Sequence, residues 1–332
     1  MKAFVVEQYG PDGLRAADVP EPGVGEGDVL VKVRAAGINP LDAMVRDGEF
    51  KRLLKYQTPF VLGHDVAGVV TRVGAAVRDF QVGDEIYARP RDLRIGTFAE
   101  YIAIDEDDVA LKPASLTLHE AAAVPLVSLA AWQALVDRAH VQPGQRVLVH
   151  AGAGGLGSTV IQLAKHLGAT VATTARGENA ELVRSLGADV VVDYTKEDFA
   201  EVLSGYDVVL DSRGGENVER SLTVLKPGGQ AIGVSGPPDP GFAKQLGAPK
   251  FTGIVMGLLS RKVRKQARRL GVSYSFLFMQ ANGAQLRELA GLYDAGHLRP
   301  LIDRTFPFDQ TLEALAYAEH GRASGKVIIT LD

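Results

Sequence analysis

The stretch GHDVAGVV places an imidazole beside a carboxylate, His64 followed by Asp65, and a second carboxylate, Asp42, comes earlier in the chain. Imidazole and carboxylate groups are ligands for zinc, and both also serve acid–base chemistry. The chain contains no cysteine, so disulfides, thiolate nucleophiles and cysteine-ligated metals are excluded. His64 is therefore either a ligand in an unusual metal site or a histidine that works without a metal.

A second motif, VLVHAGAGGLGSTVIQL, has Gly152, Gly154 and Gly157 in the spacing G-x-G-x-x-G. It follows an apolar run typical of a strand and opens a helical pattern, which is the context that gives this spacing its meaning. The first glycine permits a tight turn, the second lets backbone approach a pyrophosphate, and the third lets helix and strand pack closely. Phosphates would lie at the free N–H groups of the helix start. The motif predicts a dinucleotide site, and the alternative is a glycine-rich turn without a ligand.

The next strand, TVATTA followed by RGEN, bears on the choice between NAD and NADP. An NAD site carries an acidic residue about 20 positions after the first glycine. Here Thr173 and Thr174 are neutral, Arg176 is positive, and the first acid, Glu178, lies beyond the expected place. A guanidinium and hydroxyl groups attract a 2′-phosphate, whereas an acid repels it. The sequence therefore predicts NADPH as cofactor, unless Arg176 only begins the next helix in solvent.

Hydrophobic periodicity predicts the elements that position these motifs. From residue 146 onward, apolar runs without polar alternation alternate with helical patterns, which predicts a doubly wound parallel sheet and an α/β fold class. The first third of the chain instead shows short strands broken by glycine and proline, as in a β-rich barrel. The segment SLTLHEAAAVPLVSLAAWQALV reads as one helix with Ser115 or Thr117 as N-cap, and YSFLFM as a later strand.

Length, charge and hydropathy limit the class of protein. A chain of 332 residues suggests about two domains, and a net charge of −4 gives no general attraction to nucleic acid or anionic membrane. The longest apolar stretch is too short to span a bilayer, and the N-terminal segment lacks the pattern of a signal peptide. We expect a cytoplasmic protein with no nucleic-acid partner and no integral membrane contact. The basic segment 261–269 is expected to be a solvated helix face, with weak lipid or RNA contact as the alternative.

Several stretches together resemble the medium-chain dehydrogenase/reductase superfamily, among them AAGINPLDAMVRDGEF, GHDVAGVVTRVG, HAGAGGLGSTVIQLAKHLGA and YDVVLDSRGG. Within it, the chain is most similar to zinc-independent quinone oxidoreductases and NADPH-dependent alkenal (enone) reductases. The resemblance implies a GroES-like substrate domain in residues 1–118, an inserted Rossmann NADP-binding domain in residues 119–280, and a return to the substrate domain in residues 281–332. It also implies a homodimer or homotetramer.

The resemblance also bears on the metal. Zinc-containing members have cysteines where this chain has Asn39 and, at or near the second place, Leu126, and only His64 is shared. Asparagine is a poor zinc ligand and leucine is none, although Asp42 and Asp65 are carboxylates that could substitute. We therefore predict no metal. His64 is expected to hydrogen-bond nearby backbone, with a substrate-pocket role or a metal role as alternatives.

Without zinc, a saturated carbonyl has no strong Lewis acid to polarise it. Hydride transfer is easier to a quinone or an α,β-unsaturated carbonyl, since the negative charge passes to oxygen. The sequence thus predicts an NADPH-dependent quinone oxidoreductase or enone reductase acting on a small molecule. The alternatives are an alcohol or aldehyde dehydrogenase with an atypical metal site, and an NADPH-binding sensor without catalysis.

Three residues are the predicted catalytic groups: Asn39 as donor to the substrate oxygen, His64, and Tyr56 as a proton donor. The alternative for Asn39 is a turn residue before a proline, and for Tyr56 it is packing. Asp42 is expected to pair with Arg46, four residues on. By resemblance, further cofactor contacts fall on Gly155, Leu156, Tyr194, Ser235, Phe276, Leu277, Phe278 and Lys326, with a core strand as the alternative for the phenylalanines.

Overall fold

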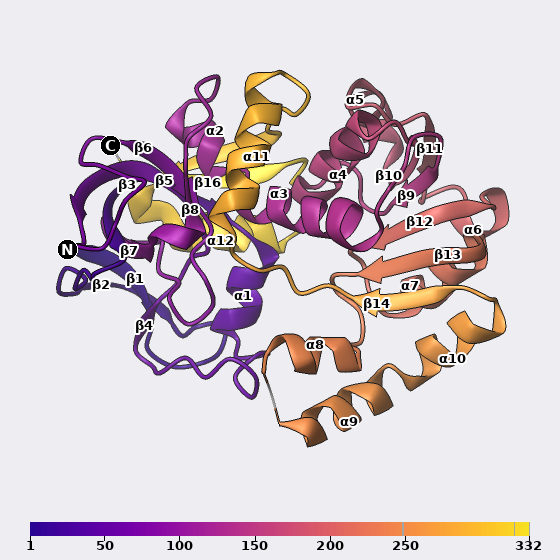
Figure 1. Cartoon of the computed structure of the whole chain (residues 1–332), viewed down its shortest axis with the longest axis horizontal. Coiled ribbons are helices and arrows are strands. Elements are labelled where there is room, and N and C mark those ends of the chain that lie inside the picture. The colour runs from indigo at the N-terminus through magenta and orange to yellow at the C-terminus, as the bar shows by residue number, and fades with distance from the viewer. Residues whose placement is uncertain (248, 322, 332) are drawn as a thin grey trace. The chain divides into compact units, whose positions relative to one another are not determined.

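The computed structural model describes residues 1–247, 249–321 and 323–331. The chain divides into two units, one made of Met1–Leu129 with Gln280–Asp332 and the other of Ala130–Met279. Each unit is therefore described by itself, with the element labels of Figure 1.

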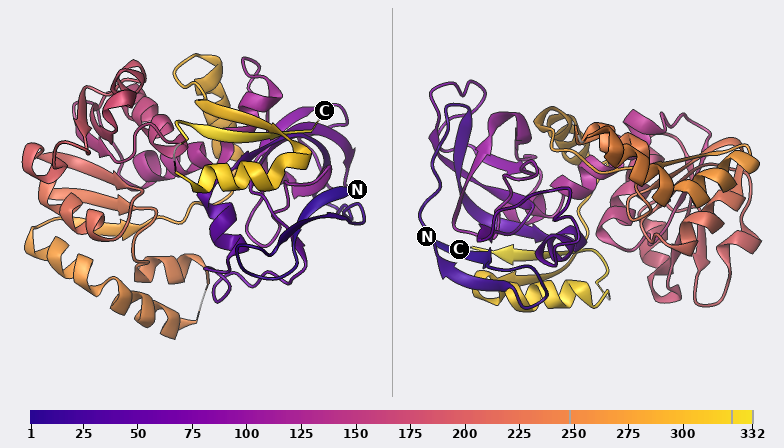
Figure 2. Two further views of the ribbon diagram at one scale, coloured as in Figure 1. Left: turned by 180° about the vertical axis from the view of Figure 1, so that it is seen from behind. Right: turned by 90° about the horizontal axis from the view of Figure 1, so that it is seen from below.

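The first unit consists mainly of strands. One sheet has the order β15-β16-β3-β5-β6-β8 with β7 also paired to β3, and a smaller one has the order β2-β1-β4. The strands are β1 (Lys2–Val6), β2 (Leu14–Asp18), β3 (Asp28–Ile38), β4 (Phe60–Val61), β5 (Asp65–Val73), β6 (Glu85–Ala88), β7 (Tyr101–Asp105), β8 (Val109–Leu111), β15 (Ile302–Pro307) and β16 (Lys326–Thr330). The helices are α1 (Pro40–Arg46), η1 (Glu106–Asp108), α2 (Leu118–Ala122), α11 (Gly283–Asp294), η5 (Phe308–Gln310) and α12 (Thr311–Glu319). Figure 2 shows α12 lying along β15 and β16, with which it is in contact.

The long strand β3 organises this unit. It pairs with β5, β7 and β16, and register shifts after Leu30 and Val33 let it bend as barrel strands must. Gly68 opposite Val33 allows the close approach, because a Cβ there would lie 2.2 Å from the carbonyl oxygen of Lys32. The pairings of Gly37 with Asp65 and of Ile38 with Val327 bring the end of β3 beside the starts of β5 and β16. Three segments far apart in sequence therefore meet at one place.

The second unit contains the predicted parallel sheet. Its order is β11-β10-β9-β12-β13-β14 and its pairs are parallel, which is the doubly wound order of dinucleotide-binding folds. The strands are β9 (Arg146–Val149), β10 (Thr170–Ala175), β11 (Val190–Asp193), β12 (Tyr206–Asp211), β13 (Leu225–Gly233) and β14 (Ser273–Phe276). The helices are η2 (Gln133–Arg138), α4 (Gly155–His166), η3 (Gly177–Asn179), α5 (Ala180–Ser185), α6 (Phe199–Val202), α7 (Glu216–Ser221), η4 (Leu222–Val224), α8 (Pro240–Gln245), α9 (Lys250–Leu259) and α10 (Arg261–Arg269). The α/β fold class is confirmed.

The helix predicted after residue 115 is instead interrupted. α2 begins at a capping box formed by Thr117 and Glu120, and α3 (Pro125–Trp132) starts at a proline, which has no N–H to continue a preceding helix. α2 packs on β3, β5 and β6, and the N–H of Leu126 donates to Asp65. The division of the chain into two units falls after Leu129, within α3.

The basic segment forms α10, which lies beside β14 (Figure 1) and buries Val263 and Ala267. Its arginine and lysine side chains are mostly exposed, as expected for a solvated face. α9 before it also exposes apolar side chains, with Ile254 at 67%. In the described ranges, no helix has the length and apolar character needed to cross a membrane.

Truncation in the centre of the parallel sheet should cost far more than truncation at its edge. Leu148 is fully buried on β9, whereas Val190 is 39% exposed on the edge strand β11. Leu148→Ala should lower the free energy of unfolding by about 2–4 kcal/mol, because it leaves a cavity. Val190→Ala should cost less than about 1 kcal/mol. Urea unfolding followed by circular dichroism measures both, and equal losses would contradict the placement of these strands.

Candidate functional site

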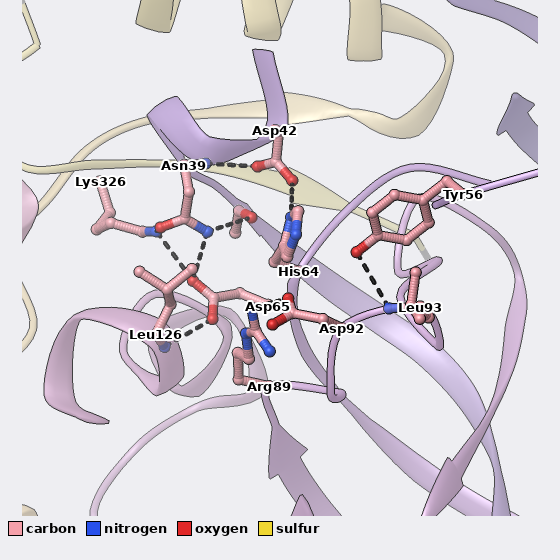
Figure 3. A network of polar contacts seen from close by, with 11 residues as sticks. Asn39, Asp42, Tyr56, His64, Asp65, Arg89, Asp92, Leu93, Leu126 and Lys326 are labelled. Carbon is pink, nitrogen blue, oxygen red and sulfur yellow. Dashed lines mark hydrogen bonds and ion pairs between the residues drawn. The ribbon is translucent and has the colours of Figure 1, made fainter. Parts of the chain in front are cut away.

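Buried polar side chains gather where β3 ends and β5 and β16 begin (Figure 3). Asp65 is fully buried, and its Oδ2 accepts from Lys326 Nζ at 3.0 Å and from Asn39 Nδ2 at 2.9 Å. Its Oδ1 accepts from the N–H of Leu126 at 2.7 Å. Asn39 Oδ1 in turn accepts from Lys326 Nζ at 2.5 Å. Each charge in this cluster is thus balanced by a partner from a distant segment.

Two predicted roles change with this geometry. Both ends of the Asn39 amide are engaged by Lys326, Asp65 and the carbonyl of Gly37, so Asn39 holds the cluster together and has no free N–H directed to a substrate oxygen. Lys326, predicted to contact the cofactor, is 5% exposed and donates to Asn39 and Asp65. The ion pair between Lys326 and Asp65 could not be predicted from the sequence, because the two residues are distant in the chain.

Asp42 and His64 form a second buried pair. Asp42 Oδ1 lies 2.6 Å from His64 Nδ1, and Asp42 Oδ2 accepts from the N–H of Asn39 at 2.7 Å. Because an ionised carboxylate only accepts hydrogen bonds, Nδ1 of His64 carries the proton and Nε2 is left without a partner among the described residues. His64 thus pairs with a carboxylate rather than with backbone. The expected pair of Asp42 with Arg46 is wrong, since Arg46 binds Asp47 and Glu319 instead.

The cluster does not present a metal-ligand set. Across residues 1–247, 249–321 and 323–331, no three His, Asp or Glu side chains are grouped as ligands for an ion. The ammonium of Lys326 already lies on Asp65, where it would repel a cation held by that carboxylate.

The loop after β6 adds a third group of side chains. Tyr56 accepts at its hydroxyl from the N–H of Leu93 at 3.2 Å. Burial raises the pKa of Tyr56 and the charge of Asp92 raises it further, so the phenol stays protonated at neutral pH. Arg89, which sequence reasoning missed, is 1% exposed and donates from Nη2 to Asp92 Oδ1 at 2.6 Å. A charged residue directly after an apolar strand was its only sequence signal.

The glycine motif forms the turn between β9 and α4. A Cβ on Gly152 would lie 2.1 Å from Thr173 Oγ1, and a Cβ on Gly157 would lie 2.3 Å from the carbonyl oxygen of Ala151. Gly154 is the N-cap of α4 and provides no side-chain cap, and no acidic residue stands in the first turn. The N–H groups of Gly155 and Leu156 therefore begin a helix whose end is open to an anion.

Two threonines of β10, Thr173 and Thr174, form hydrogen bonds next to this turn. Thr173 is buried and donates to the carbonyl oxygen of Val149 at 2.7 Å. Thr174 Oγ1 accepts from the N–H of Ala151 at 3.2 Å and lies 3.1 Å from His150 Nδ1. Both hydroxyls are thus committed within the sheet, whereas the sequence analysis directs them to a 2′-phosphate.

Arg176 and Tyr194 lie together at the carboxyl ends of β10 and β11. Arg176 is exposed, and its Nε donates to the hydroxyl of Tyr194 at 3.0 Å. Tyr194 is 52% exposed, so the pair faces solvent on the side of the sheet where a dinucleotide binds.

The remaining predicted cofactor contacts follow β13 and β14. Ser235 is exposed just after β13, while Phe276, Leu277 and Phe278 are buried. The rings of Phe276 and Phe278 pack on Phe242 with centroid distances of 5.1 and 5.0 Å. The phenylalanine side chains therefore belong to the core of the second unit.

Comparison with known proteins agrees with both units. Residues 25–114 match the family model described as alcohol dehydrogenase GroES-like domain, and residues 186–329 match the one described as zinc-binding dehydrogenase. The NADPH-dependent alkenal/one oxidoreductase, chloroplastic, of Arabidopsis thaliana is 38% identical over 99% of this chain and 79% of its own length. The 2-methylene-furan-3-one reductase of Solanum lycopersicum is also 38% identical, with the same coverage. The solved quinone oxidoreductase of Coxiella burnetii superposes with a TM-score of 0.87 at 31% identity, covering 100% of this chain and 99% of that one.

The chain belongs to the medium-chain dehydrogenase/reductase superfamily. Within it, the chain falls in the group of zinc-independent quinone oxidoreductases and alkenal reductases, as the sequence motifs indicate.

Removing one partner of the buried ion pair should be more harmful than removing both charges. Lys326→Met leaves the charge of Asp65 buried with only neutral N–H donors, from Asn39 and Leu126, and should destabilise the first unit by about 3 kcal/mol or more. The double variant Asp65→Asn/Lys326→Met should recover much of that loss, since no isolated charge remains. The midpoints of urea unfolding of the wild type, Lys326→Met and the double variant measure these changes in stability. Lys196→Met, at a surface pair with Asp193, is the control and should change stability by less than about 0.5 kcal/mol. Strictly additive effects of the two buried changes would refute the pairing.

Proposed function

We propose that the chain is an NADPH-dependent oxidoreductase that reduces a quinone or the activated C=C bond of an α,β-unsaturated carbonyl compound. The observation that carries the proposal is an open helix start at α4 together with Arg176 at the end of β10. Kinship with proteins named as an alkenal/one oxidoreductase and a quinone oxidoreductase supports the substrate class.

The second unit fits NADPH. The N–H groups of Gly155, Leu156 and Gly157 would hold the pyrophosphate, and the absence of a Cβ at Gly152 and Gly157 keeps the turn tight. Arg176 would bind the 2′-phosphate, with Tyr194 orienting the guanidinium. Ser235 would contact the cofactor at the end of β13. When bound, NADPH supplies the hydride.

The first unit would hold the acceptor. Its own side chains contain a protonated phenol at Tyr56, which could donate to a substrate oxygen, and an imidazole held by Asp42, whose Nε2 could accept a proton. A conjugated acceptor suits such groups, because its oxygen becomes negative only as hydride arrives, and N–H and O–H donors then stabilise it.

We also propose that the enzyme is cytoplasmic and forms a homodimer or homotetramer, with a nucleotide domain at 119–280 between the parts 1–118 and 281–332 of the substrate domain. The superfamily resemblance supports the assembly and the domain plan. The named Arabidopsis relative is chloroplastic, so fractionation of the source cells is the direct test of location. Size-exclusion chromatography with light scattering tests the assembly.

An acceptor panel tests the reaction. Purified protein should oxidise NADPH with a simple quinone and with a 2-alkenal, and a chelator should leave both rates unchanged. A saturated aldehyde should be a poor substrate, because nothing delocalises the charge onto a conjugated oxygen. Activity on the saturated aldehyde that vanishes with chelator would favour the metal-dependent dehydrogenase instead. Tight NADPH binding with no turnover of any acceptor would favour a sensor.

Cofactor choice should depend on Arg176. Arg176→Ala should raise the KM for NADPH by about 10–100-fold, the value of one or two charge-assisted hydrogen bonds, and leave the KM for NADH nearly unchanged. Arg184→Ala, an exposed arginine on α5 of the same unit, is the matched control and should alter neither. Equal effects of Arg176→Ala on both cofactors would argue against a 2′-phosphate contact.

A further inference from the structure

Few buried side-chain polar atoms in the described part of the chain lack a hydrogen-bond partner, and they occur close together in the sequence. They are Nε2 of His64, Nε and Nη1 of Arg89, and Oγ1 of Thr97. Thr97 in turn lies against Gly63, the neighbour of His64, since a Cβ on Gly63 would be 2.3 Å from Thr97 Oγ1. Native proteins pair nearly all such atoms, so a cluster of unpaired ones indicates a place where a ligand supplies the partner.

Arg89 is the strongest member of this cluster. Its guanidinium is 1% exposed and has five N–H donors, yet among the described residues Nε and Nη1 have no partner and Nη2 binds Asp92. Leaving buried donors of a charged group unpaired is costly, because they lose water and gain nothing in return. The other arginines of the same loop differ, since Arg91 pairs with Asp108 and Arg94 with Asp28.

The surroundings of Arg89 give a ligand room. Arg89 and Asp92 line a pocket of about 690 Å³ in the first unit, and most of its other lining side chains are charged, whereas His64 and Tyr56 do not line it. The charges of Arg89, Asp92 and Asp42 all act on the hydroxyl of Tyr56. Figure 3 draws Arg89, Asp92, Tyr56 and His64 as parts of one polar region of the first unit. The guanidinium therefore lies in the polar cluster from which the proposed acceptor would be bound.

The charge balance indicates which ligand group fits. Asp92 lies 2.6 Å from Arg89 Nη2, so the pair carries no net charge, and Nε and Nη1 keep their N–H groups. A neutral carbonyl oxygen can accept hydrogen bonds from these N–H groups. Once it becomes negative, the same N–H groups hold it more strongly, which is the property of an oxyanion site.

We propose that Arg89 binds the carbonyl oxygen of an uncharged quinone or enone and stabilises the negative charge that forms there during reduction. The inference rests on the proposed function and adds to it a catalytic residue. With NADPH bound, its hydride would add to the β-carbon of the enone, the C=C π electrons would form a double bond between the α-carbon and the carbonyl carbon, and the C=O π electrons would move onto oxygen. The enolate held by Arg89 would then take a proton at the α-carbon from solvent, leaving NADP⁺ and the saturated carbonyl compound.

Steady-state kinetics with a 2-alkenal and a simple quinone test the role. Arg89→Gln should lower kcat by about 100-fold or more, as for loss of an oxyanion donor. The dissociation constant of NADPH, measured by its fluorescence, should be unchanged. The kcat of Arg89→Lys should lie between those of the wild type and Arg89→Gln, because a single ammonium replaces the planar guanidinium with its several donors. Guanidinium ion added to Arg89→Ala should restore part of kcat, which a purely structural role would not allow.

Arg94→Gln is the matched control, because it removes an arginine of the same loop that is already paired on the surface. Its kcat should equal that of the wild type. The urea midpoint of Arg89→Gln, compared with that of the wild type, shows whether the loop still folds. A kcat for Arg89→Gln within about twofold of wild type would overturn the inference, as would an effect limited to the KM of a carboxylate-bearing enone.

A binding measurement separates this inference from the proposed reaction. A nitrophenol, whose absorbance reports its ionisation, imitates the anionic oxygen of a reduced quinone. The pKa of the nitrophenol should be lower when it is bound to the wild type with NADP⁺ than in solution. Arg89→Gln should abolish this lowering of the pKa. If wild type reduces no acceptor, the proposed function fails. If wild type reduces acceptors but the nitrophenol spectrum does not depend on Arg89, only the present inference fails.

Discussion

The fully buried carboxylate of Asp65 is the constraint on which the first unit depends. A charge removed from water is tolerated only when nearby groups replace its hydration, and three segments provide them. Lys326 comes from the start of β16, Asn39 from the end of β3, and the N–H of Leu126 from the start of α3. The backbones come so close here that a Cβ on Gly37 would lie 2.4 Å from the carbonyl oxygen of Ala122. The C-terminal strand is thereby tied to the N-terminal sheet by an electrostatic contact as well as by pairing.

The two units use polar groups in opposite ways around their candidate sites. In the second unit, Thr173, Thr174 and His150 are hydrogen-bonded within the sheet and fix the turn, while the N–H groups at the start of α4 stay available. In the first unit, Asn39 and Lys326 satisfy Asp65, while Arg89 and His64 keep unpaired atoms. Internally paired groups hold the shape, and unpaired ones mark where ligand atoms belong.

Sequence reasoning succeeded where the physics is local. The parallel sheet follows from uninterrupted apolar strands, the capping box from Thr117 and Glu120, and the phosphate turn from glycine spacing, since each depends on neighbours within a few residues. It failed where contacts between residues distant in the sequence determine the partner of a side chain. The partner of Asp42 is His64 rather than the nearby Arg46, because the N–H of Asn39 and the imidazole hold that carboxylate within the fold. The burial of Arg89 likewise depends on segments that no local pattern connects.

The site also shows how a fold shared with zinc enzymes can work through fixed charges of its own. A metal at the position of His64 would need anionic ligands, yet Asp65 is held by the ammonium of Lys326 and Asp42 by the imidazole itself. Lys326 is thus a cation within the fold that neutralises Asp65 and would repel a metal ion placed there. A reaction run by such a site must develop its charge on the substrate, next to donors that are already in place. Conjugated acceptors meet that condition because their oxygen receives the charge at a distance from the carbon that gains hydride.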